Sequence, residues 1–326
     1  MMDRRTFIVA LGIAAAPFAA LGQQPLAKVY RIGFLGTQRA SDYVTRLEAL
    51  RIGLRELGYV ENRNIVIEVR CAEGNYDRLP ELAAELVALK VDVIVVEGIS
   101  TARAAKNATT TTPIVVGNVG NAVNSGLVAS YAKPGGNITG MSFLAEELTA
   151  KRLELLKQAK PSIAKVGVLV RPVNPALVQI LGVMRSEAER NRMQIEPIEV
   201  HDASELESAF STLATRGVEG ILVHSDAVFF THAETIAALA AKHRMASVGP
   251  WDFGKAGGLI GYGVNTLDNY RHIAVFVDKI LRGAKPADMP IEQPSKIELV
   301  INLKTAKAIG LAIPQSLRLR ADEVIQ

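Results

Sequence analysis

The sequence predicts an α/β protein with two lobes, each a parallel sheet covered by helices. Apolar, β-branched runs alternate with amphipathic helical stretches, a pattern typical of parallel sheets. The alternation runs twice in the same order and with similar gaps. Strand candidates begin near Ile32, Ile65, Val93 and Ile114, and again near Val166, Ile195, Ile221 and Ala246. Two lobes that face each other form a cleft, and a cleft suits the holding of a small molecule.

The elements of the first lobe follow from apolar runs and helix-end signals. The predicted strands are Tyr30–Leu35, Asn64–Val69, Val91–Val96 and Ile114–Val116. Asp42 is expected to cap a helix that carries Leu47 and Leu54 on one face and stops at Gly58. Two further helices are predicted at Leu79–Leu89 and Ser100–Ala108.

The second lobe repeats this order. The predicted strands are Ala164–Val170, Gln194–Val200, Gly220–Val223, Ala246–Val248, Gly257–Gly261 and Lys296–Asn302. Asn174 and Pro175 are expected to open the first helix, and Ser204-x-x-Glu207 is a capping box that predicts the start of the next. Later helices are predicted up to about His243 and at Leu303–Ile309, while a helix predicted at Asn269–Leu281 returns to the first lobe.

Residues 1–24 are predicted to be a cleaved signal peptide. Arg4 and Arg5 precede an apolar run from Phe7 to Leu21, and small residues follow. The start also resembles a twin-arginine signal, so both the general secretory route and the twin-arginine route remain open. We divide the rest into a first lobe at 28–143 plus about 265–284, and a second lobe at 144–264 plus about 296–326.

Composition excludes several classes of protein. Cys71 is the only cysteine, so an intrachain disulfide and a cysteine zinc site are ruled out. The chain carries 37 Lys and Arg against 33 Asp and Glu without a basic block, which argues against nucleic-acid binding. Histidine spacing matches no metal motif, and the common nucleotide and nucleophile motifs are absent. We therefore expect no metal, no cofactor and no catalytic residues.

Candidate binding residues lie just after the predicted strands, because ligands of open parallel sheets bind beyond the carboxyl ends of the strands. These ligand-binding candidates are Thr37, Gln38, Gly98, Ser100, Thr101, Asn118, Asn121, Arg171, Asn174, Asp226, Trp251, Asp252 and Asn265.

Several of these candidates also have a structural interpretation. The hydroxyls of Ser100 and Thr101 could hold a ligand carboxylate, or Ser100 could only cap its own helix. Arg171 could pair with a ligand carboxylate or with an acidic side chain on the rim. Asp226 and Asp252 could neutralise a ligand ammonium or cap the helices that follow them. Trp251 could stack on an aromatic ligand or pack at a lobe edge.

Segments spread over nearly the whole chain resemble the ABC-transporter substrate-binding proteins of the tryptophan/tyrosine uptake type. They are Arg51–Tyr59, Tyr76–Leu86, Gly126–Gly140, Lys151–Leu156, Phe276–Pro286 and Glu298–Lys307. The resemblance implies the type I periplasmic-binding-protein architecture, with two Rossmann-like lobes joined by a hinge. It further implies a monomer in the periplasm that delivers a small-molecule ligand to an ABC permease in the inner membrane, with no enzymatic activity. An extracytoplasmic ligand sensor and an exported enzyme are the alternatives.

Departures from the family pattern concern the ligand. Asn121 stands where the family often has Asp, and Arg171 stands where it commonly has Asn. An acid lost and a base gained favour anionic ligands. We therefore expect a carboxylate-bearing ligand, an amino acid or an aromatic or organic acid, with Arg171 as the residue that pairs with it.

Overall fold

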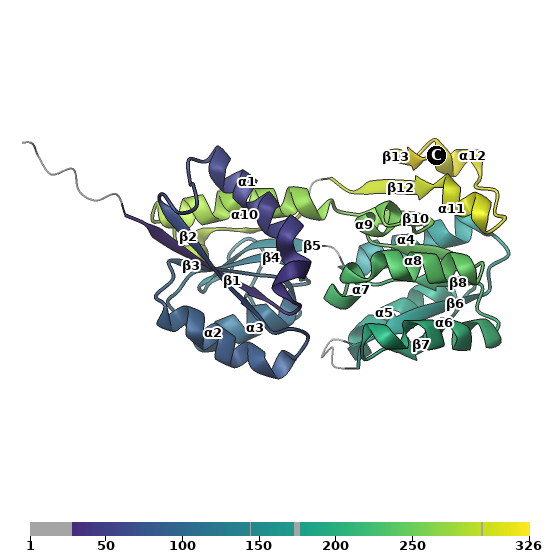
Figure 1. The fold of residues 1–326 in the computed structure, drawn as a ribbon, viewed down its shortest axis with the longest axis horizontal. Coiled ribbons are helices and arrows are strands. Elements are labelled where there is room, and N and C mark those ends of the chain that lie inside the picture. The colour runs from purple at the N-terminus through teal and green to yellow at the C-terminus, as the bar shows by residue number, and fades with distance from the viewer. Residues whose placement is uncertain (1–27, 144, 173–176, 295) are drawn as a thin grey trace, which may run out of the picture.

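The computed structural model describes residues 28–143, 145–172, 177–294 and 296–326. It has two halves that lie side by side, each with one sheet between layers of helices (Figure 1). The predicted α/β fold with two mostly parallel sheets is confirmed. The predicted signal peptide at 1–24 lies outside the described residues.

The first sheet has the strand order β11-β5-β4-β3-β1-β2, and its paired strands are parallel. Its strands are β1 (Tyr30–Gly36), β2 (Ile65–Cys71), β3 (Val93–Val96), β4 (Ile114–Gly120), β5 (Ile138–Phe143) and β11 (Ile291–Glu292).

The second sheet has the order β13-β12-β10-β9-β8-β6-β7. All its pairs are parallel except β10 with β12, which is antiparallel. The strands are β6 (Lys165–Val170), β7 (Gln194–Glu199), β8 (Gly220–Leu222), β9 (Ala246–Gly249), β10 (Ile260–Gly263), β12 (Glu298–Asn302) and β13 (Glu323–Ile325).

The two sheets share one internal order, which confirms the predicted repeat. β2-β1-β3-β4-β5 in the first corresponds to β7-β6-β8-β9-β10 in the second. In each sheet the strand order reverses beside the first strand, between β1 and β3 and between β6 and β8. Such a switch point leaves a crevice at the carboxyl ends of the two strands, where ligands of open α/β sheets bind.

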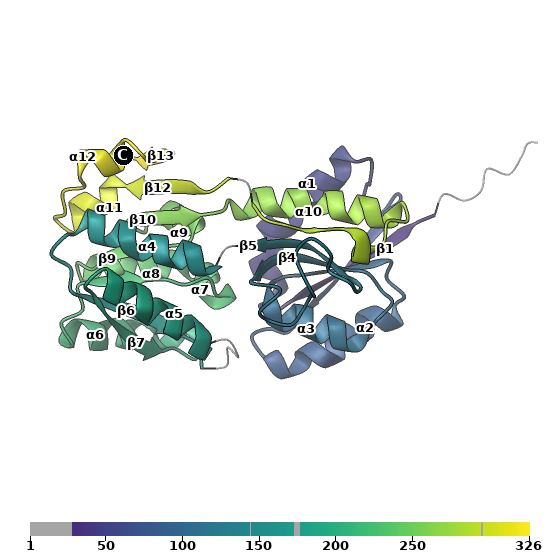
Figure 2. The same ribbon diagram turned by 180° about the vertical axis from the view of Figure 1, so that it is seen from behind.

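Helices cover both faces of each sheet (Figure 2). Around the first sheet lie α1 (Val44–Glu56), α2 (Leu79–Ala88), α3 (Gly98–Ala108) and α10 (Thr266–Leu281). Around the second lie α4 (Ala145–Ala159), α5 (Leu177–Arg190), α6 (Leu206–Thr215), α7 (Ala227–Thr231), α8 (Ala233–Lys242), α9 (Trp251–Lys255), α11 (Leu303–Ala308) and α12 (Gln315–Arg318). Short 3-10 turns lie at Ala40–Tyr43, Tyr76–Arg78, Ala203–Glu205 and Pro286–Asp288.

Burial on both sheet faces explains the strand sequences. All four residues of β3, Val93–Val96, are fully buried, because α1 and α10 cover one face of the first sheet while α2 and α3 cover the other. Such strands carry continuous apolar runs rather than alternating ones. The second sheet has α4, α5 and α11 on one face and α6 and α8 on the other.

The chain passes between the halves more than once. β5 belongs to the first sheet, and the next helix, α4, packs in the core of the second. After β10 the chain returns as α10, which packs against α1. A Cβ on Gly53 of α1 would lie 2.2 Å from the carbonyl oxygen of Arg271 in α10, so glycine permits this close approach. The chain then crosses once more, from β11 to β12.

Two predicted helix caps are wrong. Asp42 lies inside the 3-10 turn that precedes α1, where its carboxylate accepts from the backbone N–H of Arg39 (3.1 Å). The cap before α6 is Asp202, which accepts from the N–H of Ser204 (2.7 Å), so the side-chain cap lies two residues earlier than predicted. Both helices are entered through a short 3-10 turn, and such an entry moves the cap toward the N-terminus.

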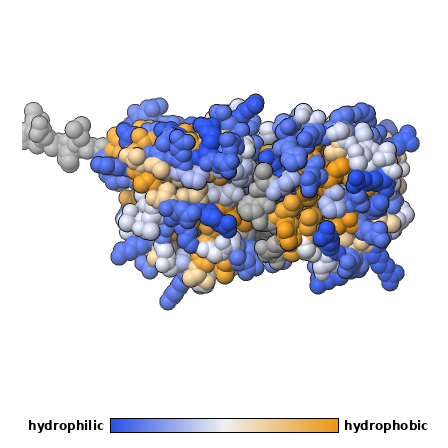
Figure 3. Space-filling view, turned by 90° about the horizontal axis from the view of Figure 1, so that it is seen from below, coloured by the Kyte–Doolittle hydropathy of each residue, from blue (hydrophilic) through white to orange (hydrophobic). Residues whose placement is uncertain are grey.

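The surface is not uniform in polarity. Seen from below, apolar side chains gather on the second half beside its boundary with the first (Figure 3). Within the described part of the chain, no helix is both long and apolar enough to cross a membrane.

Candidate functional site

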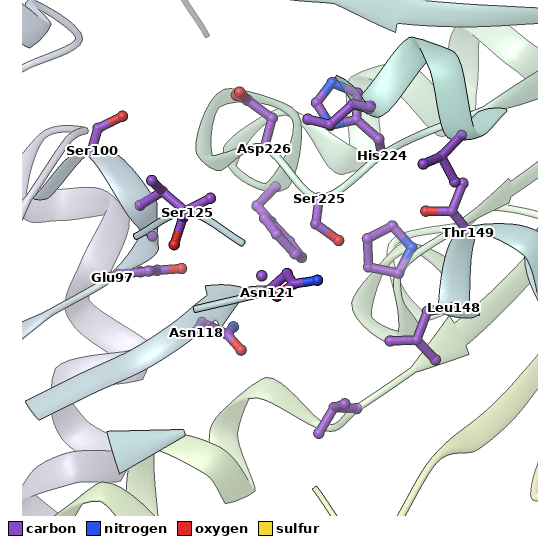
Figure 4. A pocket seen from close by; sticks show the side chains of 18 of the residues that line it. Glu97, Ser100, Asn118, Asn121, Ser125, Leu148, Thr149, His224, Ser225 and Asp226 are labelled. Carbon is purple, nitrogen blue, oxygen red and sulfur yellow. The ribbon is translucent and has the colours of Figure 1, made fainter. Parts of the chain in front are cut away.

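A cavity of about 220 Å³ lies between the halves, at the carboxyl ends of strands from both sheets. The first half contributes the ends of β1, β3 and β4 to its lining, and the second contributes α4, α5 and the loop after β8. Glu97, Ser100, Ser125 and Asn118 lie on one side of the cavity, and His224, Thr149 and Leu148 lie on the other (Figure 4). The switch points of both sheets therefore open into one shared space.

The wall formed by the first half is rich in amides and hydroxyls. Asn121 accepts with Oδ1 from the N–H of Asn124 (3.0 Å) and from the hydroxyl of Tyr131 (3.2 Å). Asn118 Oδ1 accepts from Nδ2 of Asn269 (3.5 Å). The described residues provide no acceptor for Nδ2 of either Asn118 or Asn121, so both amide groups can donate to a ligand.

Glu97 is the charged residue of this wall, and its charge is balanced within the first half. Its Oε2 accepts from Arg46 Nη1 (3.2 Å) and from the hydroxyl of Tyr270 (2.6 Å). Burial lowers the pKa of Arg46, but Glu97 together with Tyr270, Tyr43 and Asp252 raises it by more. Burial and the charge of Glu97 together raise the pKa of Tyr270 well above its usual range, so the phenol remains a donor.

The wall formed by the second half combines apolar side chains with a different charge pattern. Leu148, Ile180, Val183 and Met184 supply apolar surface from α4 and α5. Arg152, on the same helix as Leu148, donates from Nε to the carbonyl oxygen of Tyr262 (2.8 Å).

The loop after β8 places a histidine and an acid at the same wall. His224 packs its ring edge-on against Phe229, at 5.3 Å between ring centroids. Asp226 caps α7 by accepting from the N–H of Val228 (2.9 Å). Burial lowers the pKa of His224, while the nearby charge of Asp226 opposes this shift and Arg152 adds to it.

Aromatic contacts join the halves around the cavity. The guanidinium of Arg46, from α1, lies 5.1 Å from the ring centroid of Phe230 in α7. A second contact has its cation in the second half and its ring in the first: the guanidinium of Arg171, after β6, lies 5.9 Å from the ring centroid of Tyr76. Each contact pairs a cation from one half with an aromatic ring from the other. They hold the halves in the arrangement that encloses the cavity.

The family model for ABC transporter substrate binding protein matches residues 43–325. The chain belongs to this family. It is 25% identical over 260 residues to the tyrosine-binding protein of Clostridioides difficile (strain R20291), an alignment that covers 79% of this chain and 74% of that protein. Two solved structures have the same fold at 24% sequence identity. Each alignment covers 91% of this chain and 100% of the other chain. One is a conserved domain protein from Vibrio cholerae O1 biovar eltor (TM-score 0.84), and the other is an ABC domain from Streptococcus pneumonia in complex with L-Trp (TM-score 0.82).

The sequence resemblance to ABC substrate-binding proteins is therefore confirmed. Six of the predicted binding residues of this family member line the cavity: Thr37, Gly98, Ser100, Asn118, Asn121 and Asp226. In the described part of the chain, no three His, Cys, Asp or Glu side chains are grouped as a metal site would require.

The other predicted binding residues that the structure describes lie outside the lining. Gln38 is buried nearby, and Thr101 donates its hydroxyl to the carbonyl oxygen of Glu97. Trp251 lies against Lys255, with 5.1 Å from the ammonium to the ring centroid. Asn174 lies outside the described residues.

Three more predicted residues contact other parts of the protein and do not line the cavity. Asn265 caps α10 by accepting from the N–H groups of Leu267 (3.1 Å) and Asp268 (3.4 Å). The carboxyl group of Asp252 is hydrogen-bonded to Thr266, and burial raises the pKa of Asp252. Arg171 is buried beside the cavity under the ring of Tyr76, which itself lines the cavity.

Sequence reasoning missed the charged residues on helices and at the end of β3. Arg152 follows Leu148 by four residues and precedes Leu156 by four, so it lies on the apolar face of its helix. A charge on an apolar face is a usable signal, because charged groups are seldom buried without a reason. Glu97 comes directly after β3 and before the segment selected from the sequence.

Proposed function

We propose that this ABC substrate-binding protein captures a small carboxylate-bearing ligand, an amino acid or an aromatic or organic acid, in the cavity between its halves. The observation that carries the proposal is the cavity itself, which is lined by both halves at both switch points. Its volume of about 220 Å³ suits a ligand the size of one amino acid, since pockets for drug-sized molecules begin near 300 Å³. The relatives that hold tyrosine and L-Trp support this class.

Capture proceeds by hinge closure in this proposal. The three chain passages between the halves act as the hinge, and the contacts of Phe230 with Arg46 and of Tyr76 with Arg171 form as the cavity closes. The ligand gains contacts with both walls only in the closed form, so it shifts the equilibrium toward closure. The closed form is then presented to the ABC permease, and the ligand leaves unchanged.

The site of action in this proposal is the periplasm. The N-terminal pattern at 1–24 supports export with removal of the signal peptide. The protein acts there as a monomer. Cell fractionation followed by N-terminal sequencing of the mature chain tests this part, and a cytoplasmic, unprocessed chain would contradict it.

The binding proposal is tested by thermal unfolding of the mature protein with amino acids, aromatic acids and aliphatic carboxylates. A ligand at about 100 times its Kd adds about 2.7 kcal/mol to the free energy of unfolding, which raises Tm measurably. The control for each acid is its carboxamide, which lacks the carboxylate charge. We expect a shift with acids of one class and recovery of the ligand unchanged. No shift with any acid would overturn the carboxylate proposal, and conversion of the ligand would show an enzyme.

A further inference from the structure

One wall of the cavity holds a buried cation that none of the described acidic side chains pairs with. The cation is Arg152, a residue that is only 2% exposed. Its hydrogen bond from Nε goes to a neutral carbonyl oxygen, that of Tyr262. Among the described residues, no carboxylate lies within 4.0 Å of its guanidinium. Arg152 is one of the residues that line the cavity.

A comparison with Arg46 shows how unusual this is. Arg46 is 8% exposed and is paired with the carboxylate of Glu97. A buried charge is costly unless it is paired, and an unpaired one is retained where it serves a function. Burial lowers the pKa of Arg152 to about 9, which leaves the guanidinium charged at neutral pH. The second wall of the cavity therefore carries the permanent positive charge of Arg152, together with the acidic side chain of Asp226 in the loop after β8.

His224 is a second, independent observation at the same wall. It is 4% exposed, it lines the cavity, and its Nε2 has no hydrogen-bond partner among the described residues. Arg152 and His224 line the same wall of the cavity, and the charge of Arg152 contributes to the lowered pKa of the imidazole. A buried imidazole nitrogen without a partner indicates a missing polar group in the cavity. A carboxylate between Arg152 and His224 would satisfy both side chains, with the ring protonated as the anion binds.

The opposite wall does not compete for the same anion. Its Glu97 is neutralised by Arg46 and Tyr270, and its other polar groups are amides and hydroxyls. Arg171, the base selected from the sequence, lies outside the lining and faces the ring of Tyr76. Its Nε also lacks a hydrogen-bond partner among the described residues, which makes Arg171 the competing candidate. Of the two arginines, only Arg152 borders the cavity, so the anionic end of a ligand is attracted there.

We propose that Arg152, with His224 beside it, forms the carboxylate subsite of the cavity and that Arg171 does not. This inference rests on the proposed function and assigns one end of its ligand. The carboxylate lies against α4 and the loop after β8, and the apolar part of the ligand packs on Leu148, Met184 and Phe230. The amides of the first half meet the remaining polar groups of the ligand.

The test compares acids by calorimetry with their carboxamides, which lack the carboxylate charge. The probes are L-tryptophan, L-tyrosine and benzoate, each with its carboxamide, bound to wild type, Arg152→Met and the matched control Arg171→Met. Loss of one partner of a buried charge pair corresponds to at least about a 30-fold loss of affinity. We expect Arg152→Met to lose its preference for the acid by that factor, and Arg171→Met to keep it.

Further measurements separate a binding role from a structural one. Arg152→Lys should keep a preference for the acid with weaker binding, because the charge remains without the planar fork. His224→Gln should weaken acid binding about tenfold, since one of two groups that contact the carboxylate is lost. Without ligand, Arg152→Met should melt no lower than wild type, because it removes an unbalanced buried charge.

The outcomes distinguish the two proposals. If wild type binds none of these acids in preference to the amide, the proposed function fails and this inference fails with it. If wild type prefers the acid and Arg152→Met binds the acid as wild type does, this inference alone is overturned. If Arg152→Met does not fold, the same result for His224→Gln overturns it. If Arg171→Met is the variant that loses the preference, the subsite belongs to Arg171.

Discussion

Replacement of Glu97 by Gln should destabilise the ligand-free protein strongly, because it leaves a buried cation without its carboxylate. Glu97 is 9% exposed and accepts from both Arg46 and Tyr270. A glutamine side chain at this position would keep the shape and one acceptor but lose the charge. Removal of one partner from a buried pair costs about 3–5 kcal/mol, whereas an exposed pair contributes about 0–1 kcal/mol. We expect a loss of about 3 kcal/mol, at the lower end of that range, because the amide oxygen still accepts.

The assay is urea unfolding of the ligand-free protein, which separates stability from ligand binding. The double variant with Arg46→Met removes both charges, so it should recover part of the loss and give a coupling energy of at least about 1–2 kcal/mol. The matched control is Glu207→Gln, which breaks the exposed pair with Lys242 and should leave the transition unchanged. A loss below about 1 kcal/mol for Glu97→Gln, or no coupling with Arg46, would refute the buried ion pair.

Three further predictions concern the cavity. Burial lowers the pKa of His224 against the charge of Asp226, so the unfolded state binds more protons below about pH 6.5 and stability falls as the pH decreases from there. Urea unfolding of His224→Gln between about pH 7.5 and about pH 5 should show a smaller decrease than wild type, and equal slopes would contradict this. Asp226→Asn keeps the cap of α7 but removes a charge, so calorimetry should show about tenfold weaker binding of amino acids and no weakening for acids that lack an amine; equal losses would count against an ammonium contact. Phe230→Ala removes the ring that lies on Arg46, so stopped-flow measurements should show ligand release several-fold faster, and an unchanged rate would argue against its part in closure.

The parts of the fold that repeat along the chain could be predicted from the sequence. Val93–Val96 predicts a strand buried on both faces, and the structure places it between two helical layers. The repeated order of strands predicts two similar sheets, and both have the same internal order. Helix caps were less predictable. Asp42 and Ser204 have the right chemistry, but the entry of the helix through a 3-10 turn depends on how the preceding loop packs.

The candidate site was predictable where it depends on strand ends. Thr37, Ser100, Asn118 and Asp226 follow strands or end them, and all four line the cavity. Trp251 also follows a strand, and its neighbour Pro250 lines the cavity, yet Trp251 itself lies outside the lining and its ring lies against Lys255. Which of two adjacent residues at a strand end borders the cavity depends on the backbone of the loop, which the spacing of apolar runs does not reveal.

The sequence by itself determined the α/β class, the repeat and the strand-end segments, because these depend on periodic burial and on signals within a few residues. Only the tertiary structure decided which buried arginine lines the cavity without an acidic partner among the described residues. Arg46 meets Glu97, Arg171 meets the ring of Tyr76 from the other half, and Arg152 is left with a carbonyl oxygen. The charge of the cavity is a sum over side chains from both halves, and that sum exists only once the halves face each other.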